Sequence, residues 1–274
     1  MAVTQYSQQM LAGGIGLLAL LDCMSFVASA ALVAAIPASP RTERTPAART
    51  DLSARITRLR TDWRDGIRLC LRRRVLRTIA VFLLITSVGE GVMSTLFAPF
   101  VRSVLHASAG TYGLISAAQA IGGIGGGLLA ASIGNRLRAT RTMGRAAVAF
   151  GLIDLAVFLY PGGYAATWPA MVLMIVVGVP GALTVTSMTT LLQRQTADSQ
   201  RGRVFGALSA VEGIAVVAGT SAAGFLGRTL GIVPILVAQG VGYVLAGTLV
   251  VMLLRHAPPP RPAPEIRAHR AAAR

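Results

Sequence analysis

Lysine is absent from this chain of 274 residues, and charged residues of all kinds make up only 13% of it. All 26 basic residues are therefore arginines, and against ten acids they give a net charge of +16. Aromatic residues are also scarce, at 5%. The two cysteines, Cys23 and Cys70, have no paired spacing, so neither a disulfide framework nor a cysteine-based metal site is indicated.

The motifs of common soluble enzymes are missing as well. The sequence has no GxxxxGK(S/T) phosphate loop, no HExxH and no GxSxG. The three histidines, His106, His256 and His269, lie outside the long apolar runs, and their spacing suggests no metal site. We therefore expect no enzymatic activity, no cofactor and no bound metal.

Long apolar runs are the main feature that is present. Hydrophobic residues make up 54% of the chain and the mean hydropathy is +0.64. A helix needs roughly 20 apolar residues to cross a bilayer. These features predict an all-α membrane protein, a polytopic transmembrane helical bundle of about seven spans. The predicted spans are Leu11–Ile36, Leu76–Phe100, Thr111–Ile133, Ala146–Tyr160, Trp168–Leu192, Val204–Leu226 and Ile232–Leu254.

The arginines predict how these spans are oriented. If the spans alternate in direction, every arginine except Arg102 and Arg228 falls on the same side. Because cytoplasmic segments carry the excess of basic residues, we expect the N-terminus outside and the C-terminus in the cytoplasm of a cell with this protein in its plasma membrane. A basic chain can also bind nucleic acid. Arginines confined to the gaps between apolar runs favour the topological interpretation, and we expect no nucleic-acid partner.

A long polar segment divides the chain. We assign residues 1–36 to a first span, 37–75 to a cytoplasmic linker, 76–255 to a six-helix half and 256–274 to a disordered basic tail. Within the linker, residues 51–73 carry apolar side chains at steps of three and four, which predicts an amphipathic helix on the membrane surface. A regulatory or partner-binding helix is the alternative for this segment.

Acids inside the spans are the candidates for chemistry. Glu90, Asp154 and Glu212 each lie within an apolar run, where a charged carboxylate is costly. Burial raises the pKa of a carboxyl group in general, so these residues are candidate proton carriers. The alternative is that each is a neutral acid bonded to a neighbouring helix. Gln119 and Gln239, at similar depth, either contact a polar substrate or bond a neighbouring helix.

Two further features concern movement between helices. Gly178, Pro180 and Gly181 predict a kink in the fifth span, which is either a gating hinge or a static bend. The glycine run 122–127 permits close helix packing.

Two basic turns on the expected cytoplasmic side are candidate latches between helices, since arginine can bond helix C-terminal carbonyls or an acid. The alternative is that they only set topology. The candidate latch residues are Asp198, Arg201, Arg203 and Arg136.

Several of these segments together resemble the major facilitator superfamily, in particular its drug-efflux antiporters related to enterobactin exporters and macrolide efflux proteins. The resemblance runs from about Leu20 to Arg255. It is carried by LDCMSF at 21–26, RDGIR at 64–68, GEGVM at 89–93, GVPGA at 178–182 and RGRVFGA at 201–207.

The resemblance implies a fold of twelve spans in two halves, in which this chain begins at the sixth span and five N-terminal spans are missing. It also implies a bacterial transporter that exports a small amphipathic or cationic molecule, such as a drug, a macrolide or a siderophore-like compound, in exchange for protons. The alternative is a truncated membrane protein that does not transport, or a half-transporter that needs a separate N-terminal half as its partner.

The topology is testable with reporter fusions. An odd number of spans should place tags at the two ends of the chain on opposite faces of the membrane, with the C-terminal tag in the cytoplasm. Protease protection of each tag in sealed cells measures this directly. Both tags on one face, or a chain that dissolves without detergent, would contradict the predicted topology.

Overall fold

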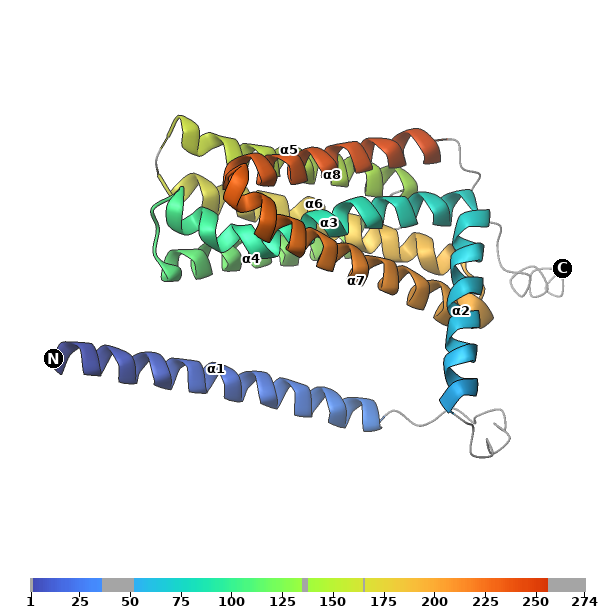
Figure 1. The fold of residues 1–274 in the computed structure, drawn as a ribbon, viewed down its shortest axis with the longest axis horizontal. Coiled ribbons are helices and arrows are strands. Elements are labelled where there is room, and N and C mark those ends of the chain that lie inside the picture. The colour runs from blue at the N-terminus through green and yellow to red at the C-terminus, as the bar shows by residue number, and fades with distance from the viewer. Residues whose placement is uncertain (1, 36–51, 135–137, 165, 256–274) are drawn as a thin grey trace. The chain divides into compact units, whose positions relative to one another are not determined.

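The computed structural model describes residues 2–35, 52–134, 138–164 and 166–255 (Figure 1). The expectations for residues 37–49 and for the tail 256–274 lie outside the described residues. The chain divides into two compact units, residues 1–54 and 55–274, which are considered separately.

The long helix among the described residues of the N-terminal unit is α1 (Ala2–Ala35), of 34 residues. Its apolar part, Ala19–Ala35, is shorter than the helices of the second unit that can cross a membrane. Asp22 lies in this part, and its backbone carbonyl accepts a hydrogen bond from the Ser25 hydroxyl at 2.8 Å.

The second unit is a bundle of long helices, with no strand in the described part of the chain. Six of its helices are long and apolar enough to cross a membrane, which confirms the predicted all-α polytopic bundle. The elements are α2 (Leu52–Arg72), α3 (Arg74–Ser103), α4 (Ala109–Ile133), α5 (Ala139–Leu159), the short 3-10 turn η2 (Tyr160–Gly162), α6 (Trp168–Gln195), α7 (Asp198–Thr229) and α8 (Ile232–Leu254).

Helix α5 begins earlier than the apolar run that predicts it. The sequence places the start of this span near Ala146, whereas the helix starts at Ala139 and includes Arg141 and Arg145. Long arginine side chains can keep their charge at the membrane surface while their helix enters the apolar layer. Hydropathy alone therefore sets the start of this helix too late.

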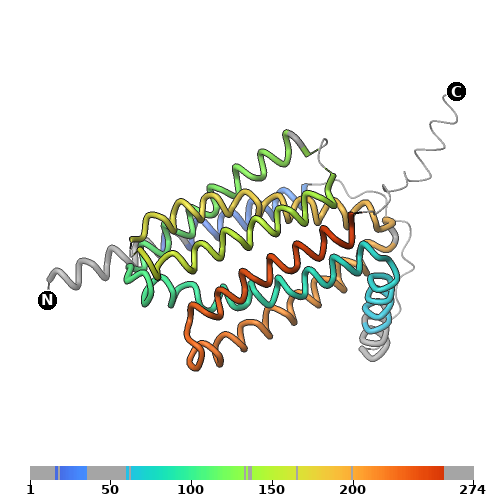
Figure 2. The backbone as a smooth tube through the Cα atoms, turned by 90° about the horizontal axis from the view of Figure 1, so that it is seen from above, coloured from blue at the N-terminus to red at the C-terminus, as the bar shows by residue number. Residues whose placement is uncertain are grey.

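Helix α2 crosses one end of the bundle (Figures 1 and 2). It covers the segment in which the spacing of apolar residues predicts an amphipathic helix. Gly66 lets α2 approach the start of α7 closely, since a Cβ at this position would lie 2.9 Å from the Cβ of Ala207. Cys70 is buried in a core cluster with Leu76, and this burial raises the pKa of the Cys70 thiol, which makes the thiol unreactive.

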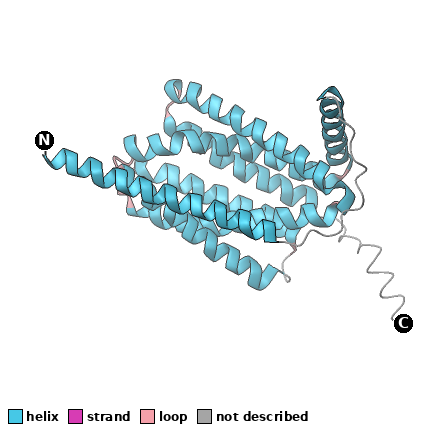
Figure 3. Ribbon diagram, turned by 90° about the horizontal axis from the view of Figure 1, so that it is seen from below, coloured by secondary structure: helices cyan, strands magenta, loops and turns pink. Residues whose placement is uncertain are grey.

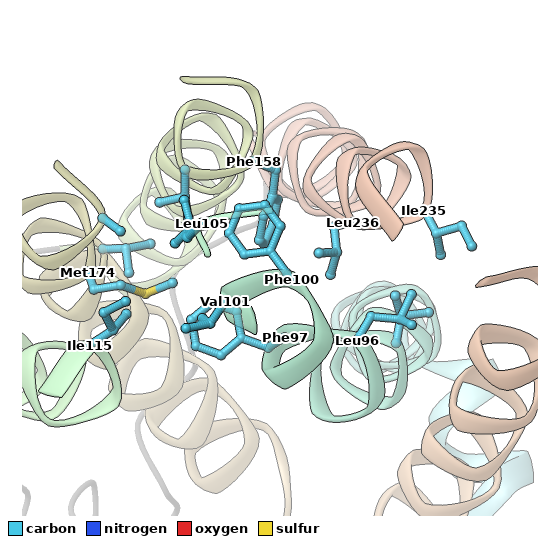
Figure 4. Packing of buried hydrophobic residues seen from close by; sticks show 14 of the residues in the cluster. Leu96, Phe97, Phe100, Val101, Leu105, Ile115, Phe158, Met174, Ile235 and Leu236 are labelled. Carbon is cyan, nitrogen blue, oxygen red and sulfur yellow. The ribbon is translucent and has the colours of Figure 1, made fainter. Parts of the chain in front are cut away.

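Helices that follow one another in the chain are mostly not the ones that pack together. Helix α4 packs on α6, α6 on α5, α5 on α8, α8 on α3, and α3 on α7. The helices run alongside one another through the bundle (Figure 3), and α4 and α7 are the two ends of this series. Apolar clusters fill the interior, and in one of them the rings of Phe100 and Phe158 meet edge to face with centroids 5.4 Å apart (Figure 4).

Glycines bring α4 and α6 into backbone contact. A Cβ built at Gly178 would lie 2.6 Å from the backbone carbon of Gly122, and one at Gly126 would lie 2.7 Å from the Cα of Val179. Gly122 and Gly126 are four residues apart and share one face of α4, which is the spacing that membrane helices use for close packing. Gly125 lies on another face, where a Cβ would have no atom within 4 Å.

Adjacent glycines in α4 provide a matched test of this packing. Gly126→Leu should lower the free energy of unfolding by about 1 to 3 kcal/mol, because the new side chain has no room against Val179. Gly125→Leu should leave stability unchanged or raise it slightly, since leucine favours the helix more than glycine does. Thermal unfolding of the purified variants in one detergent compares them, and equal losses for the two would rule out the packing.

Candidate functional site

Polar side chains from three helices meet inside the bundle in two hydrogen-bonded pairs. The Tyr243 hydroxyl of α8 donates to Oε1 of Glu90 in α3. One turn earlier in α8, Gln239 Nε2 donates to Oδ2 of Asp154 in α5 at 3.0 Å. Helix α8 therefore presents both donors, because residues four apart lie on the same side of a helix.

Glycines on the neighbouring helices make room for these side chains. A Cβ at Gly89 would lie 2.8 Å from Cγ of Gln239, so only glycine fits α3 against α8 at this level. A Cβ at Gly151 in α5 would lie 2.9 Å from the Cβ of Tyr243. The close approach of α3 and α5 to α8 is thus what brings the two acids within hydrogen-bonding distance of their donors.

The two acids, Glu90 and Asp154, differ in how much of each residue is exposed. Asp154 is 1% exposed and Gln239 is 6% exposed, so this pair is sealed inside the bundle. Glu90 is exposed, whereas the Tyr243 that bonds it is buried and packs its ring 4.6 Å from that of Phe150. The cluster therefore has an open end at Glu90 and a closed end at Asp154.

The acids of this cluster are close enough to interact electrostatically. Glu90 acts on Asp154 through space, and both Glu90 and Glu212 of α7 act on Tyr243. Glu212 is exposed. Among the described residues, the recorded ion pair lies at the start of α7 and does not involve these acids. In this part of the chain, the site thus gathers carboxyl groups that form no ion pair with an arginine.

One polar atom in the closed pair has no partner. Oε1 of Gln239 is buried and accepts no hydrogen bond from the residues that the structure describes. A side-chain amide carries both a hydrogen-bond donor and an acceptor, so the Oε1 atom of Gln239 remains available as a buried acceptor next to the bond with Asp154.

Three of the five polar candidates from the sequence meet in this cluster, namely Glu90, Asp154 and Gln239. Glu212 reaches it electrostatically through Tyr243. Gln119 lies elsewhere, on α4 where that helix contacts Gly178 of α6.

Sequence reasoning missed Tyr243. The available signal was its position four residues after Gln239, which places its hydroxyl on the same side of an otherwise apolar helix.

The candidate hinge lies beside this cluster. Helix α6 continues through Pro180, whose carbonyl accepts a hydrogen bond from Thr184 Oγ1 at 2.8 Å. Gly181 faces Phe150, and a Cβ there would lie 3.3 Å from its ring. Since Phe150 packs on Tyr243, the Pro180 segment is connected to the site through one aromatic side chain.

The ion pair recorded among the candidate latch residues lies within the start of α7, so this pair does not join two helices. Arg201 bonds Asp198 at 3.0 Å, but both belong to α7 and the Asp198 side chain is 87% exposed. Arg136 lies outside the described residues. A helix-joining contact occurs elsewhere, since Arg73 Nη1 donates to the carbonyl of Gln195 at the end of α6 at 2.5 Å.

A bundle of six helices that are long and apolar enough to cross a membrane belongs to the class of multi-pass membrane proteins. Residues 79–273, more than half of the chain, match the sequence model of the Major Facilitator Superfamily. The chain therefore belongs to the Major Facilitator Superfamily, a family of transporters and not a class of enzymes. A comparison with curated proteins found no match.

The closed pair can be tested by a double-mutant cycle. Gln239→Leu should lower the free energy of unfolding by about 1 to 3 kcal/mol, because it leaves the buried Asp154 without its donor. Asp154→Leu should have a similar effect, and the double variant should be more stable than the sum of the two losses predicts. Unfolding in detergent measures the coupling. Gln119→Leu is the control, and it should show no coupling to Asp154→Leu.

Proposed function

We propose that this chain is part of a secondary active transporter that exports a small amphipathic or cationic molecule in exchange for protons, as in the drug, macrolide or siderophore efflux group that its motifs resemble. The observation that carries the proposal is the pair of acids that are bonded to donors on successive turns of α8, with Glu90 of α3 exposed and Asp154 of α5 buried. In this proposal Glu90, Asp154 and Glu212 carry the protons.

The partners of the two acids suit groups that change protonation state. A hydroxyl donates to a carboxylate and can accept from a protonated acid. An amide does the same after a half-turn that exchanges its nitrogen and oxygen. Tyr243 and Gln239 therefore supply a hydrogen bond to Glu90 and Asp154 in either state, which avoids the cost of an unpaired polar group at each step.

The charge of the site favours a cationic ligand. Glu90 and Glu212 are exposed on α3 and α7, and no arginine pairs with either among the described residues. A cation that binds there would neutralise carboxylates that protons otherwise neutralise, so the ligand and the protons would compete for one site. Bending of α6 at Pro180 would reach the site through Phe150, which makes Gly178, Pro180 and Gly181 our candidates for the gate.

A separate N-terminal half is the partner that we infer for this bundle. The two helices at the ends of the packing series carry glycines with no atom within 4 Å, Gly123 and Gly127 on α4 and Gly213 and Gly224 on α7. Faces of small residues are where membrane helices pack closely. In this arrangement the protein lies in the plasma membrane with its C-terminus in the cytoplasm, and a bundle without its second half would not transport.

Proton-coupled efflux is tested in cells that contain both halves of the transporter and are loaded with a cationic dye. Glu90→Gln and Asp154→Asn should each remove most of the efflux that an uncoupler abolishes, because neither amide side chain can carry a proton between the two sides. Tyr243→Phe should weaken efflux less, since it removes a hydrogen bond and not a proton carrier.

Asp22→Asn makes the same chemical change at an acid of α1 that belongs to neither hydrogen-bonded pair, and it should leave efflux intact. Undiminished efflux in both Glu90→Gln and Asp154→Asn would remove these acids from the mechanism. Expression with and without the coding region directly upstream separates the roles of the two halves. Dye efflux by the shorter form alone would contradict the need for a second half.

A further inference from the structure

A large groove lies between α5 and α6, away from the acid cluster. Its volume is about 920 Å³, and residues of these two helices form its walls. One end is lined by Arg138, Arg141 and Arg145, and the rest mostly by apolar side chains. The acids and amides of the candidate transport site are not among its lining residues.

The groove opens on the outer side of the bundle. On α5 its wall is formed by residues such as Thr142 and Ala149, whereas Gly151 packs against α8 and Phe158 against Phe100 of α3. On α6 the lining Val176 is 47% exposed. The faces that we assign to the N-terminal half lie on α4 and α7, so the exposed apolar surface of this groove on α5 and α6 faces lipid, and its natural occupant comes from the bilayer.

The basic end of the groove is built to receive an anion. Arg141 and Arg145 are four residues apart and project on one side of α5, and Arg138, which directly precedes the helix, also lines the groove. All three are exposed, and no carboxylate of the described residues forms an ion pair with them. A second cavity of about 350 Å³ on the α8 side shares Arg141 and Arg145 and adds Arg255, which makes this end of α5 more strongly positive.

The start of α5 adds a second attraction for negative charge. Arg138 precedes the helix and makes no side-chain capping bond, and the first bonds to its carbonyl come from Arg141 and Thr142. The backbone N–H groups that precede Arg141 have no carbonyl partner within the helix, so they point out of the helix start. The helix dipole at this end also favours an anion. Guanidinium groups bind phosphate oxygens through paired hydrogen bonds.

The apolar end of the groove has the length of a lipid chain. Ile153 lies eight residues beyond Arg145, which is about 12 Å along a helix. This distance is close to half of the hydrocarbon thickness, roughly 15 Å, which one lipid tail covers. Val176, Val179 and Leu183 of α6 complete the apolar wall beside it.

We propose that the α5–α6 groove binds an anionic phospholipid, with the phosphate among Arg138, Arg141 and Arg145 and one acyl chain along Ile153, Val176 and Leu183. Basic pockets between membrane helices recognise anionic headgroups in this way. The lipid would hold the start of α5 against the middle of α6, next to Pro180, which also lines the groove. This site does not depend on the chain carrying protons.

Native mass spectrometry of the full chain tests the site with two lipids of identical acyl chains, phosphatidylglycerol and phosphatidylcholine. The chain should retain phosphatidylglycerol preferentially. The double variant Arg141→Gln/Arg145→Gln should lower that preference by roughly thirtyfold, because each arginine near the membrane surface contributes about 1 kcal/mol to anionic lipid binding. The control Arg77→Gln/Arg194→Gln removes two exposed arginines that line no described cavity, and it should keep the preference.

The apolar wall is tested separately, so that the result does not rest on charge alone. Val176→Trp fills the groove and should reduce retention of phosphatidylglycerol, whereas Val185→Trp, at an exposed position of α6 outside the groove, should not. Thermal unfolding first confirms that each variant is folded. Equal loss in the arginine control, retention unchanged in Val176→Trp, or displacement of the lipid by soluble glycerol phosphate would each overturn the proposal.

Discussion

Hydrocarbon offers no hydrogen-bond partner, and this constraint governs the bundle. The backbone N–H and C=O groups of the bundle therefore form hydrogen bonds within helices. In the described part of the chain, each segment that can cross a membrane is helical throughout. A short hydroxyl inside such a bundle can bond a carbonyl of its own helix, as Thr184 does, whereas the acids Asp154 and Glu90 find their partners on another helix. Asp154 finds Gln239 and Glu90 finds Tyr243, and both contacts exist only because α3 and α5 approach α8 closely.

Glycine is the residue that makes these approaches possible. Gly89 and Gly151 admit the side chains of the polar cluster, while Gly122, Gly126 and Gly178 bring α4 and α6 into backbone contact. Without water to drive apolar surfaces together, membrane helices associate through such close packing and through hydrogen bonds. In this protein both act on the same interfaces, so the geometry of the acid site and the stability of the bundle depend on one set of small residues.

The bundle separates two chemistries by position. Within the described residues, acids without basic partners gather at the cluster on α3, α5 and α7, whereas arginines without acidic partners lie at the end where α5 begins. The inner group suits protons and a cationic ligand, and the outer group suits a phosphate held beside an apolar wall. Helix α6 borders both, because Gly181 meets Phe150 of the site while Pro180 lines the outer groove. A lipid bound outside would therefore contact the same segment that we propose as the gate.

The sequence by itself predicts the helices and most of the polar residues of the site. Local hydropathy determines which segments enter lipid, so the sequence predicts the last span at Ile232–Leu254, which are the bounds of α8. Helices such as α5 and α7 begin before the apolar runs that predict them, at Ala139 and Asp198. Glu90, Asp154 and Gln239 stood out because polar residues are rare in apolar runs.

The tertiary structure alone decided which of these residues meet. Glu90 and Tyr243 are 153 positions apart, and nothing in either segment shows that the helices carrying them are neighbours. The same is true of the groove, which exists only where α5 and α6 lie side by side. A helix forms from interactions along the chain, whereas the choice of its neighbours depends on how surfaces of separate helices fit together, and that fit is a property of the assembled bundle.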